Sequence, residues 1–492
     1  MTEINEKNIE LDDVLDKFGL FRRYHLKAIA LVFLAFVSNA AYCNNFVFTA
    51  ESVQYRCADS SSYGLTCGNL TQSCGKWVYE DSNSFVAEFQ LACQEWKRTL
   101  VGSAHSFGYM LGLPLVGFLS DKLGRKTTTI LTGVLGGIFG ILRSFSLWYW
   151  FFIAMEFLEA FIGDICSPIY VLSLEMVSSK KRLPFNMLVS LGYPFGGVAL
   201  GLVAWLSPNW RWTLRILYTP ALLFIFYKFC LKESPRWLLS NGKKDKAIDI
   251  LEEAAECNKI KLDRSMLERI SFPENENASF RETLKHTLSS SKLRTRFFVC
   301  VVWWMTCTFV NYGLVINSVS LEGNRYMNFI LTQLVELPGI FIITYVLIHC
   351  KRKKPLILSF LAGGMLCVVH PFIPKDLTWA STTVYMFSKL MSSFYFSITY
   401  LYTSELFPTY SRNSMHALCS SLGRTGSILA QQTPLLMIYW KGLPAIVFGS
   451  ASLIAGLLTL LVPDVAQDSL PDNVSQAEAL GKTKGKTALK EK

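Results

Sequence analysis

The chain has 492 residues, of which 51% are hydrophobic and only 17% are charged, and its net charge is +11. This composition argues against a set of soluble domains, because roughly twelve apolar stretches of about 18 to 25 residues recur, each long enough to cross a bilayer as a helix. The positive charge does not indicate a nucleic-acid partner, since the basic residues cluster in short loops, as is typical of the cytosolic loops of membrane proteins. We therefore expect an all-α integral membrane protein embedded in the lipid bilayer.

The beginning of the chain indicates its orientation. Residues 1–27 are polar and precede the first apolar run, so we expect a cytosolic N-terminal segment without a cleavable signal peptide. Residues 28–231 hold six apolar stretches, the first two of which are separated by a polar loop, residues 47–98. This loop carries four cysteines and one glycosylation sequon, at Cys57, Cys67, Cys74, Cys93 and Asn69. Disulfides form on the oxidising side of the membrane, and a glycosylation sequon agrees with that side. We therefore expect this loop to be extracellular.

A charged turn follows the second apolar stretch, with the sequence Gly117-Phe118-Leu119-Ser120-Asp121-Lys122-Leu123-Gly124-Arg125-Lys126. It is so short that it must be a tight connection between two membrane helices at one membrane face. Its basic residues favour the cytosolic face, and Gly124 allows the chain to turn. The spacing closely resembles the loop after helix 2 in the major facilitator superfamily of transporters.

The second half of the chain repeats the organisation of the first. Residues 232–296 are polar and of mixed charge and predict a cytosolic helical linker, residues 297–463 hold six more apolar stretches, and residues 464–492 form a lysine-rich cytosolic tail. The same spacing between a glutamate and an arginine recurs at corresponding helix ends, in the segments Glu175 to Arg182 and Glu405 to Arg412. Parallel repeats of this kind are expected to place the substrate at the membrane midplane, between the halves.

The charged residues at these helix ends suggest a cytosolic gate, although they are alternatively plain surface charges. We expect the gate to consist of Asp121, Gly124, Arg125, Glu175, Arg182, Glu405 and Arg412. The counterpart of the opening turn in the second half, His349-Cys350-Lys351-Arg352-Lys353-Lys354, is degenerate, so we expect the gate to be asymmetric.

Motifs along nearly the whole chain resemble a narrower group, the organic cation, anion and carnitine transporter family. They include Phe18-Gly19-x-Phe21-x-Arg23, Cys93-x-x-Trp96-Lys97, Glu233-Ser234-Pro235-Arg236-Trp237-Leu238 and Glu405-Leu406-Phe407-Pro408-Thr409. The resemblance implies twelve transmembrane helices in two pseudo-symmetric six-helix halves, which transport a small organic ion by alternating access. We expect a monomeric transport unit with cytosolic termini. The disulfide loop and the glycosylation sequon favour the plasma membrane, although an internal secretory membrane would satisfy the same loop chemistry.

Three charged side chains near mid-bilayer are candidate substrate ligands, because charge inside a membrane is costly. These are Glu336, Lys389 and Arg424. A guanidinium stays charged and binds a carboxylate with two hydrogen bonds, so Arg424 favours an anionic or zwitterionic substrate. Lys389 and Arg424 also match bases that the resemblance implies for anion and carnitine carriers. Alternatively, either base forms a structural ion pair with Glu336.

Two departures from the family pattern favour a zwitterion over a simple dianion. Ile340 stands where the anion carriers resemble one another in having lysine, and Glu156 stands where many superfamily members have arginine. An organic cation carrier driven by the membrane potential is the nearest rival, and a sensor that does not transport is a more distant one. Glu156, Glu159 or Asp164 is able to carry a proton, but whether H⁺ or Na⁺ is coupled stays open.

Aromatic residues are expected to line the cavity, since their faces attract organic cations by about 0.5 to 2 kcal/mol each. Positions that match the family's aromatic lining are Trp304, Tyr312, Tyr193, Phe195, Phe396 and Tyr400, and Asn39 is a polar candidate. The alternative for each aromatic residue is ordinary lipid-facing packing. No catalytic triad, metal-ligand spacing or phosphate-binding loop stands out, so we expect neither an enzyme nor a cofactor.

Overall fold

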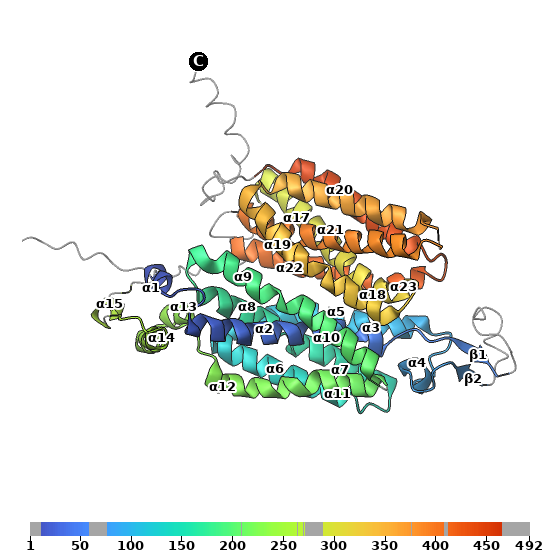
Figure 1. Ribbon diagram of the computed structural model, residues 1–492, viewed down its shortest axis with the longest axis horizontal. Coiled ribbons are helices and arrows are strands. Elements are labelled where there is room, and N and C mark those ends of the chain that lie inside the picture. Colours follow the sequence, from blue (N-terminus) through green and yellow to red (C-terminus); the bar gives the residue numbers. More distant parts are fainter. Residues whose placement is uncertain are drawn as a thin grey trace, which may run out of the picture. The chain divides into compact units, whose positions relative to one another are not determined.

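The computed structural model describes residues 11–58, 76–207, 209–262, 264–268, 270, 289–374, 376–407 and 412–464. The chain divides into two compact units, which are described separately (Figure 1). The first unit comprises Met1–Asn45, Leu111–Val203 and Arg211–Asn277, and the second comprises Phe46–Met110, Ala204–Trp210 and Ala278–Lys492.

Helices dominate the first unit. They are α1 (Leu11–Lys17), α2 (Arg23–Asn44), α6 (Arg125–Arg143), α7 (Tyr149–Ile162), α8 (Cys166–Glu175), α9 (Arg182–Ser190), α10 (Gly192–Leu206), α11 (Trp210–Tyr218), α12 (Tyr227–Cys230), α13 (Pro235–Ser240), α14 (Lys244–Cys257) and α15 (Arg264–Glu268). A short 3₁₀ helix, η1 (Ser179–Lys181), precedes α9, and η2 (Thr219–Phe226) joins α11 to α12. The last residues of α10 belong to the second unit.

The second unit is also mainly helical. Its helices are α3 (Phe46–Thr49), α4 (Phe85–Glu88), α17 (Ser291–Asn317), α18 (Arg325–Leu334), α19 (Glu336–His349), α20 (Lys353–Val369), α21 (Thr378–Glu405), α22 (Arg412–Ala430), α23 (Thr433–Leu436) and α24 (Leu443–Leu458). The 3₁₀ helices η3 (Ser318–Ser320), η4 (His370–Phe372) and η5 (Thr459–Leu461) follow α17, α20 and α24. Helix α5 (Glu95–Leu123) begins in this unit and ends in the first.

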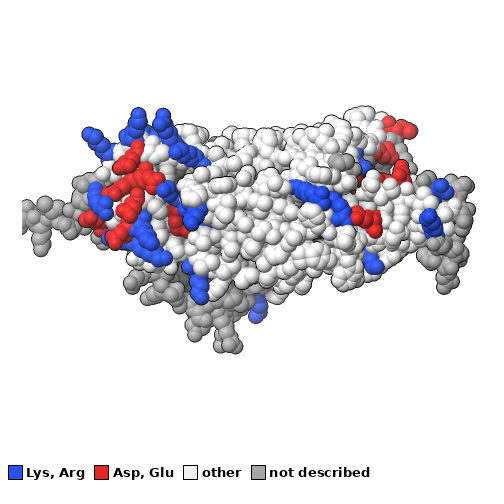
Figure 2. Space-filling view, turned by 90° about the horizontal axis from the view of Figure 1, so that it is seen from below, with Lys and Arg blue, Asp and Glu red and all other residues white. Residues whose placement is uncertain are grey.

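Eight helical stretches are long and apolar enough to cross a membrane, by length and composition. Four further helices, α5, α6, α21 and α22, have 29, 19, 28 and 19 residues, so each is about 28 Å long or more. Within the described residues these stretches give the twelve spans that the sequence predicts. Figure 2 shows charged side chains in separate clusters with a wide uncharged surface between them, as expected where helices face hydrocarbon.

Prolines interrupt several of these spans. Pro168 has no N–H to donate to the carbonyl of Asp164, and the helix is broken between α7 and α8 at this point. The Asp164 carboxylate accepts hydrogen bonds from the backbone N–H groups of Cys166 (3.0 Å) and Ser167 (3.2 Å) at the start of α8. Pro338 likewise leaves the carbonyl of Leu334 without a helical donor, and α18 ends there.

Helix α17 is the centre of the second unit and packs against α21, α22 and α24 (Figure 1). Its closest neighbour is α22, where a Cβ added to Gly423 would lie 2.6 Å from the Trp304 side chain, so glycine is required for this approach. The Thr308 hydroxyl donates to the Gly423 carbonyl across the contact, at 2.6 Å. This packing fixes the position of the next residue on α22, Arg424.

The loop before α5 contains a two-stranded antiparallel sheet, β1 (Tyr55–Cys57) and β2 (Trp77–Tyr79). Cys57 and Cys93 are each disulfide-bonded. The predicted cysteines Cys67 and Cys74 and the predicted glycosylation site at Asn69 lie outside the described residues. The cysteine pairing and the glycan therefore stay predictions.

Candidate substrate site

Lys389 and Glu336 form an ion pair between α21 and α19. The distance from Lys389 Nζ to Glu336 Oε1 is 2.7 Å, and the two side chains are 1% and 14% exposed. Lys389 also donates to the Asn311 side-chain oxygen on α17 at 2.8 Å, and the Asn311 amide donates to Ser392 at 3.1 Å. The sequence leaves two roles open for Lys389, that of a substrate ligand and that of a structural partner of Glu336. The structure shows the ion pair with Glu336. The sequence analysis did not identify Asn311. Its place directly before Tyr312, as a polar residue in an apolar stretch, could have indicated it.

Arg424 projects from α22 into an aromatic environment. Its guanidinium donates to the Tyr312 hydroxyl at 3.3 Å and lies over the Tyr109 ring, 4.7 Å from the ring centre. Asn311 and Tyr312 are consecutive on α17, so this one helix contacts both Lys389 and Arg424. The sequence predicted Tyr312 but not Tyr109, because nothing in the spacing aligns α5 with α22.

The formal charges of the three predicted ligands sum to one positive charge. Lys389 and Glu336 form an ion pair at 2.7 Å, and the Arg424 guanidinium donates to the Tyr312 hydroxyl and lies over the Tyr109 ring. A half-buried guanidinium between aromatic groups is weakly hydrated, which favours binding of a carboxylate.

Trp304, Phe396 and Tyr400, which the sequence predicts as cavity-lining residues, form one aromatic cluster, and their part in substrate binding stays a prediction. The Trp304 ring centre lies 6.0 Å from that of Phe396 and 5.7 Å from that of Tyr400. Trp304 is buried and its indole N–H donates to the Thr403 hydroxyl at 3.1 Å, which fixes the orientation of this ring. His416 on α22 completes the cluster, 5.3 Å from Trp304, and was missed because a lone histidine gives no pattern.

The remaining predicted ligands lie in the first unit. Asn39 is buried on α2, and the Tyr193 hydroxyl accepts a hydrogen bond from the Asn44 amide at 3.3 Å. Phe195 is exposed and its ring centre lies 5.8 Å from that of Phe33. Their part in substrate binding stays a prediction.

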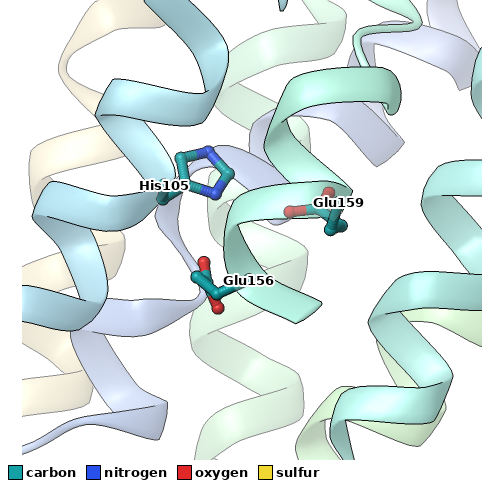
Figure 3. Close-up of side chains that lie close together, drawn as sticks. All are labelled: His105, Glu156 and Glu159. Atoms are coloured by element: carbon teal, nitrogen blue, oxygen red, sulfur yellow. The ribbon is translucent and has the colours of Figure 1, made fainter. Parts of the chain in front are cut away.

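The acids of the fourth span are buried with a base that sequence reasoning missed. Arg143, at the end of α6, forms an ion pair with Glu156 on α7, and both side chains are 0% exposed. Arg143 also donates to the Asn45 side chain (3.0 Å) and to the Tyr218 hydroxyl (3.1 Å). Glu159 lies one turn after Glu156 on α7 and is also buried (Figure 3). Arg143 could have been identified from the sequence, because it is a charged residue at the end of an apolar stretch.

Two of the predicted cytosolic gate residues of the first unit, Asp121 and Glu175, contact a third, Arg125. Its guanidinium donates to Asp121 at 2.8 Å and to both oxygens of Glu175 at 3.3 Å. Gly124 has φ of +97°, a conformation that other residues rarely adopt. Arg182 donates to the Leu174 carbonyl at 3.3 Å.

In the second unit Glu405 pairs with Arg352, at 3.3 Å. The side chain of Arg412 lies outside the described residues, so its predicted role stays untested. Arg352 belongs to the degenerate counterpart of the opening turn and corresponds to Arg125. The pairs Arg125–Glu175 and Arg352–Glu405 thus repeat one arrangement in the two units, and that repeat was a signal available in the sequence.

We expect charge reversal at Glu405 to impair transport and a second reversal to restore it. Glu405→Arg places two cations together where a partly exposed pair worth up to about 1 kcal/mol stood, so the initial uptake rate should fall by about fivefold or more. Adding Arg352→Glu recreates the pair and should return the rate to within twofold of the wild type. Failure of the double variant to recover, at equal surface expression, would contradict a role for this pair in the gate.

For the Lys389–Glu336 pair we expect stability rather than substrate selectivity to change. Lys389→Met leaves a largely buried carboxylate and should destabilise the protein by about 3 kcal/mol, whereas adding Glu336→Gln should recover most of this loss. Thermal denaturation in detergent measures the loss and the recovery. If the double variant is stable but no longer distinguishes carboxylate substrates from their esters, Lys389 binds substrate and is not structural.

The comparisons with known proteins agree with this architecture. The family model of the Major Facilitator Superfamily matches residues 94–431. Among solved structures, the xylose transporter XylE from E. coli in an inward open conformation has a TM-score of 0.64 at 15% identity, covering 92% of this chain and 99% of its own. At that identity the likeness shows the fold alone. The fold and the family model together define a major facilitator carrier, a multi-pass membrane protein and not an enzyme.

Relatives among curated proteins narrow this class. Solute carrier family 22 member 1 from Oryctolagus cuniculus is 33% identical over 82% of this chain and 74% of its own length. The organic cation transporter protein of Drosophila melanogaster is 32% identical over 84% of this chain and 78% of its own. Solute carrier family 22 member 3 from Rattus norvegicus is 29% identical over 89% of this chain. The chain belongs to the organic cation and anion transporter family of this superfamily.

Proposed function

We propose that the protein carries small organic ions bearing a carboxylate, zwitterions above all, by alternating access. The observation that carries this proposal is the ion pair of Lys389 with Glu336 at 2.7 Å, together with the contacts of Arg424 to Tyr312 and Tyr109. With that ion pair formed, Arg424 supplies the net charge of the three ligands. A substrate carboxylate is the group that this charge attracts most strongly.

The aromatic cluster supports a substrate with an alkylated or flat body. Trp304, Phe396 and Tyr400 present apolar faces in the same helical unit as Arg424. An ammonium group at the other end of a zwitterion gains about 0.5 to 2 kcal/mol from such a face. Arg424 would then bind the carboxylate end of the substrate, and an aromatic face the ammonium end.

An organic cation carrier is the second candidate, because relatives are named organic cation transporters and Glu336 is an acid in the site. The 2.7 Å contact with Lys389 weakens this candidate, since the Glu336 charge is already neutralised by a fully buried ammonium. A cation would also meet the positive charge of Arg424.

We further propose that the protein acts in the plasma membrane as a monomeric unit, with residues 47–98 outside and both termini in the cytosol. The bonded cysteines Cys57 and Cys93 support an oxidising environment for that loop. The two six-helix halves, residues 28–231 and 297–463, would then move about a site at the midplane.

The test compares three labelled probes in cells clamped at two membrane potentials: carnitine, benzoate and tetraethylammonium. A cation gains about 2.3 kcal/mol per 100 mV on entry, whereas a zwitterion gains nothing. We expect saturable carnitine uptake that changes less than twofold between the two potentials. Uptake of tetraethylammonium alone, rising steeply with a more negative interior, would replace the proposal with the cation carrier, and binding without any flux would indicate a sensor.

A further inference from the structure

A cavity of about 260 Å³ lies in the second unit, at the helix ends next to the predicted extracellular loop. Four helix ends surround it, and its lining includes Glu51, Glu95, Arg98, Thr99, Gln431 and Phe46. The lining thus includes two carboxylates, a guanidinium, an aromatic ring and neutral hydrogen-bonding groups. Sites for small ligands typically combine an apolar lining with a few polar groups in this way.

Glu51 is one of the two acidic residues that line this cavity. It pairs with Arg325 on α18, and its side chain is 17% exposed. Arg98 donates its hydrogen bonds to Glu95 at 2.6 Å and to the Ala50 carbonyl at 3.2 Å, although its charge also acts on Glu51. A carboxylate accepts about four hydrogen bonds through its two oxygens, so Glu51 is able to receive a second cation beside Arg325.

The cavity and Arg424 lie along the same two helices. Thr99 lines the cavity and Tyr109 contacts Arg424, and these residues are ten apart on α5, which corresponds to about 15 Å. Gln431 lines the cavity seven residues after Arg424. The cavity is therefore displaced by about 10 to 15 Å from Arg424, towards the predicted extracellular side.

Two amides separate the cavity from Arg424. Gln432 donates to Ser103 at 2.5 Å and accepts from Thr99 at 3.0 Å, and Gln431 donates to Ser106 at 3.4 Å. These contacts follow one another along α5 between Thr99 and Tyr109. Neutral hydrogen bonds would therefore lie between a ligand in the cavity and Arg424. Exchanging such hydrogen bonds for others costs little net free energy.

We propose that this cavity is a second, outer binding site for the ammonium end of a small organic ion, with Glu51 as its anionic ligand and Phe46 as its aromatic wall. As an entry site it rests on the proposed function, but the site itself does not need Arg424. Burial raises the pKa of Glu51 to about 7, although Arg325 and Arg98 oppose the rise. A bound ammonium group would share the Glu51 carboxylate with Arg325.

Protection of an introduced thiol tests the site directly. Ser52 lines the cavity and is exposed, so Ser52→Cys gives a target for a membrane-impermeant maleimide added from outside. The probe is tetramethylammonium, which has no carboxylate for Arg424 to bind. We expect it to slow labelling of Ser52→Cys by at least threefold, both in the parent and with Arg424→Ala. With Glu51→Gln, half-maximal protection should need about tenfold more probe.

Each alternative result has a distinct meaning. Absence of protection in the parent would overturn the proposal, as would protection that survives Glu51→Gln. Protection that disappears with Arg424→Ala would also overturn it, because the label would then report occupancy of the inner site. The matched control is Glu80→Gln, which removes an exposed acid of the same loop and should leave protection unchanged. Failure of carnitine transport would refute the proposed function without affecting this readout.

Protection should also depend on external pH. The charged groups facing Glu51 are Arg325 on α18, Arg98 and Glu95 on α5, and Asp81 in the loop. With a pKa of about 7, the carboxyl is mainly protonated at pH 6 and mainly ionised at pH 8. Half-maximal protection should therefore need about tenfold more tetramethylammonium at pH 6 than at pH 8. Equal protection at both pH values, with Glu51 intact, would contradict a role for its charge.

Discussion

Arg424→Ala is expected to lower carnitine uptake, measured as Vmax/KM, by about 30-fold or more. The variant removes a charge-assisted, two-point contact to the substrate carboxylate, worth about 2 kcal/mol or more in a partly desolvated site. Arg424→Lys should retain an intermediate rate, because it keeps the charge but loses the planar fork that also lies over the Tyr109 ring. Radiotracer uptake normalised to surface expression measures all three proteins.

The matched control for Arg424 is Tyr312→Phe. It removes the hydroxyl that accepts from the guanidinium at 3.3 Å, while the arginine and its charge remain. A single neutral contact of this kind contributes about 1 kcal/mol, so we expect a loss of roughly fivefold. If Arg424→Ala and Tyr312→Phe lose the same small factor, Arg424 is a packing residue and does not bind the carboxylate.

Arg143→Met should destabilise the protein by about 3 to 5 kcal/mol, the largest effect on stability that we expect. The change leaves Glu156 and Glu159 buried without the guanidinium that pairs with Glu156 and hydrogen-bonds Asn45 and Tyr218. The midpoint of thermal denaturation of the purified protein in detergent measures the loss.

A second substitution separates charge from packing at this pair. Adding Glu156→Gln to Arg143→Met removes the unbalanced carboxylate and should recover at least half of the lost stability. Arg294→Met, at an exposed position of α17, makes the same side-chain change and should shift the midpoint very little. No recovery in the double variant would indicate that Arg143 stabilises the fold by packing against Phe152 and Tyr218 alone.

The membrane fold could be predicted because its signals are local. Apolar length, the turn around Asp121 and Arg125, and the repeated helix ends all lie within short segments of the sequence. The breaks before Cys166 and Glu336 were also readable, since Pro168 and Pro338 each remove one helical hydrogen bond.

The partners of the charged residues could not be predicted, because they depend on which helices adjoin. Mid-helix spacing identified Glu336, Lys389 and Arg424, but either base was a possible partner for Glu336 until α19 and α21 were placed together. Tyr109 and His416 enter the site only through helix packing. Arg143 and Arg352, in contrast, could have been identified from the sequence. Arg143 is a charged residue at the end of an apolar stretch, and Arg352 lies in the segment that corresponds to the turn around Arg125.

The most direct test of the carboxylate assignment is the ratio of carnitine uptake to uptake of carnitine methyl ester, in the wild type and in Arg424→Asp. The ester keeps the ammonium and the size but has no carboxylate charge, so each ratio isolates the contact made by residue 424. We predict a ratio above about ten in the wild type, and a ratio below one in Arg424→Asp, where an acid would favour the cationic ester. The same ratio in both proteins would contradict the assignment of Arg424 as the carboxylate ligand.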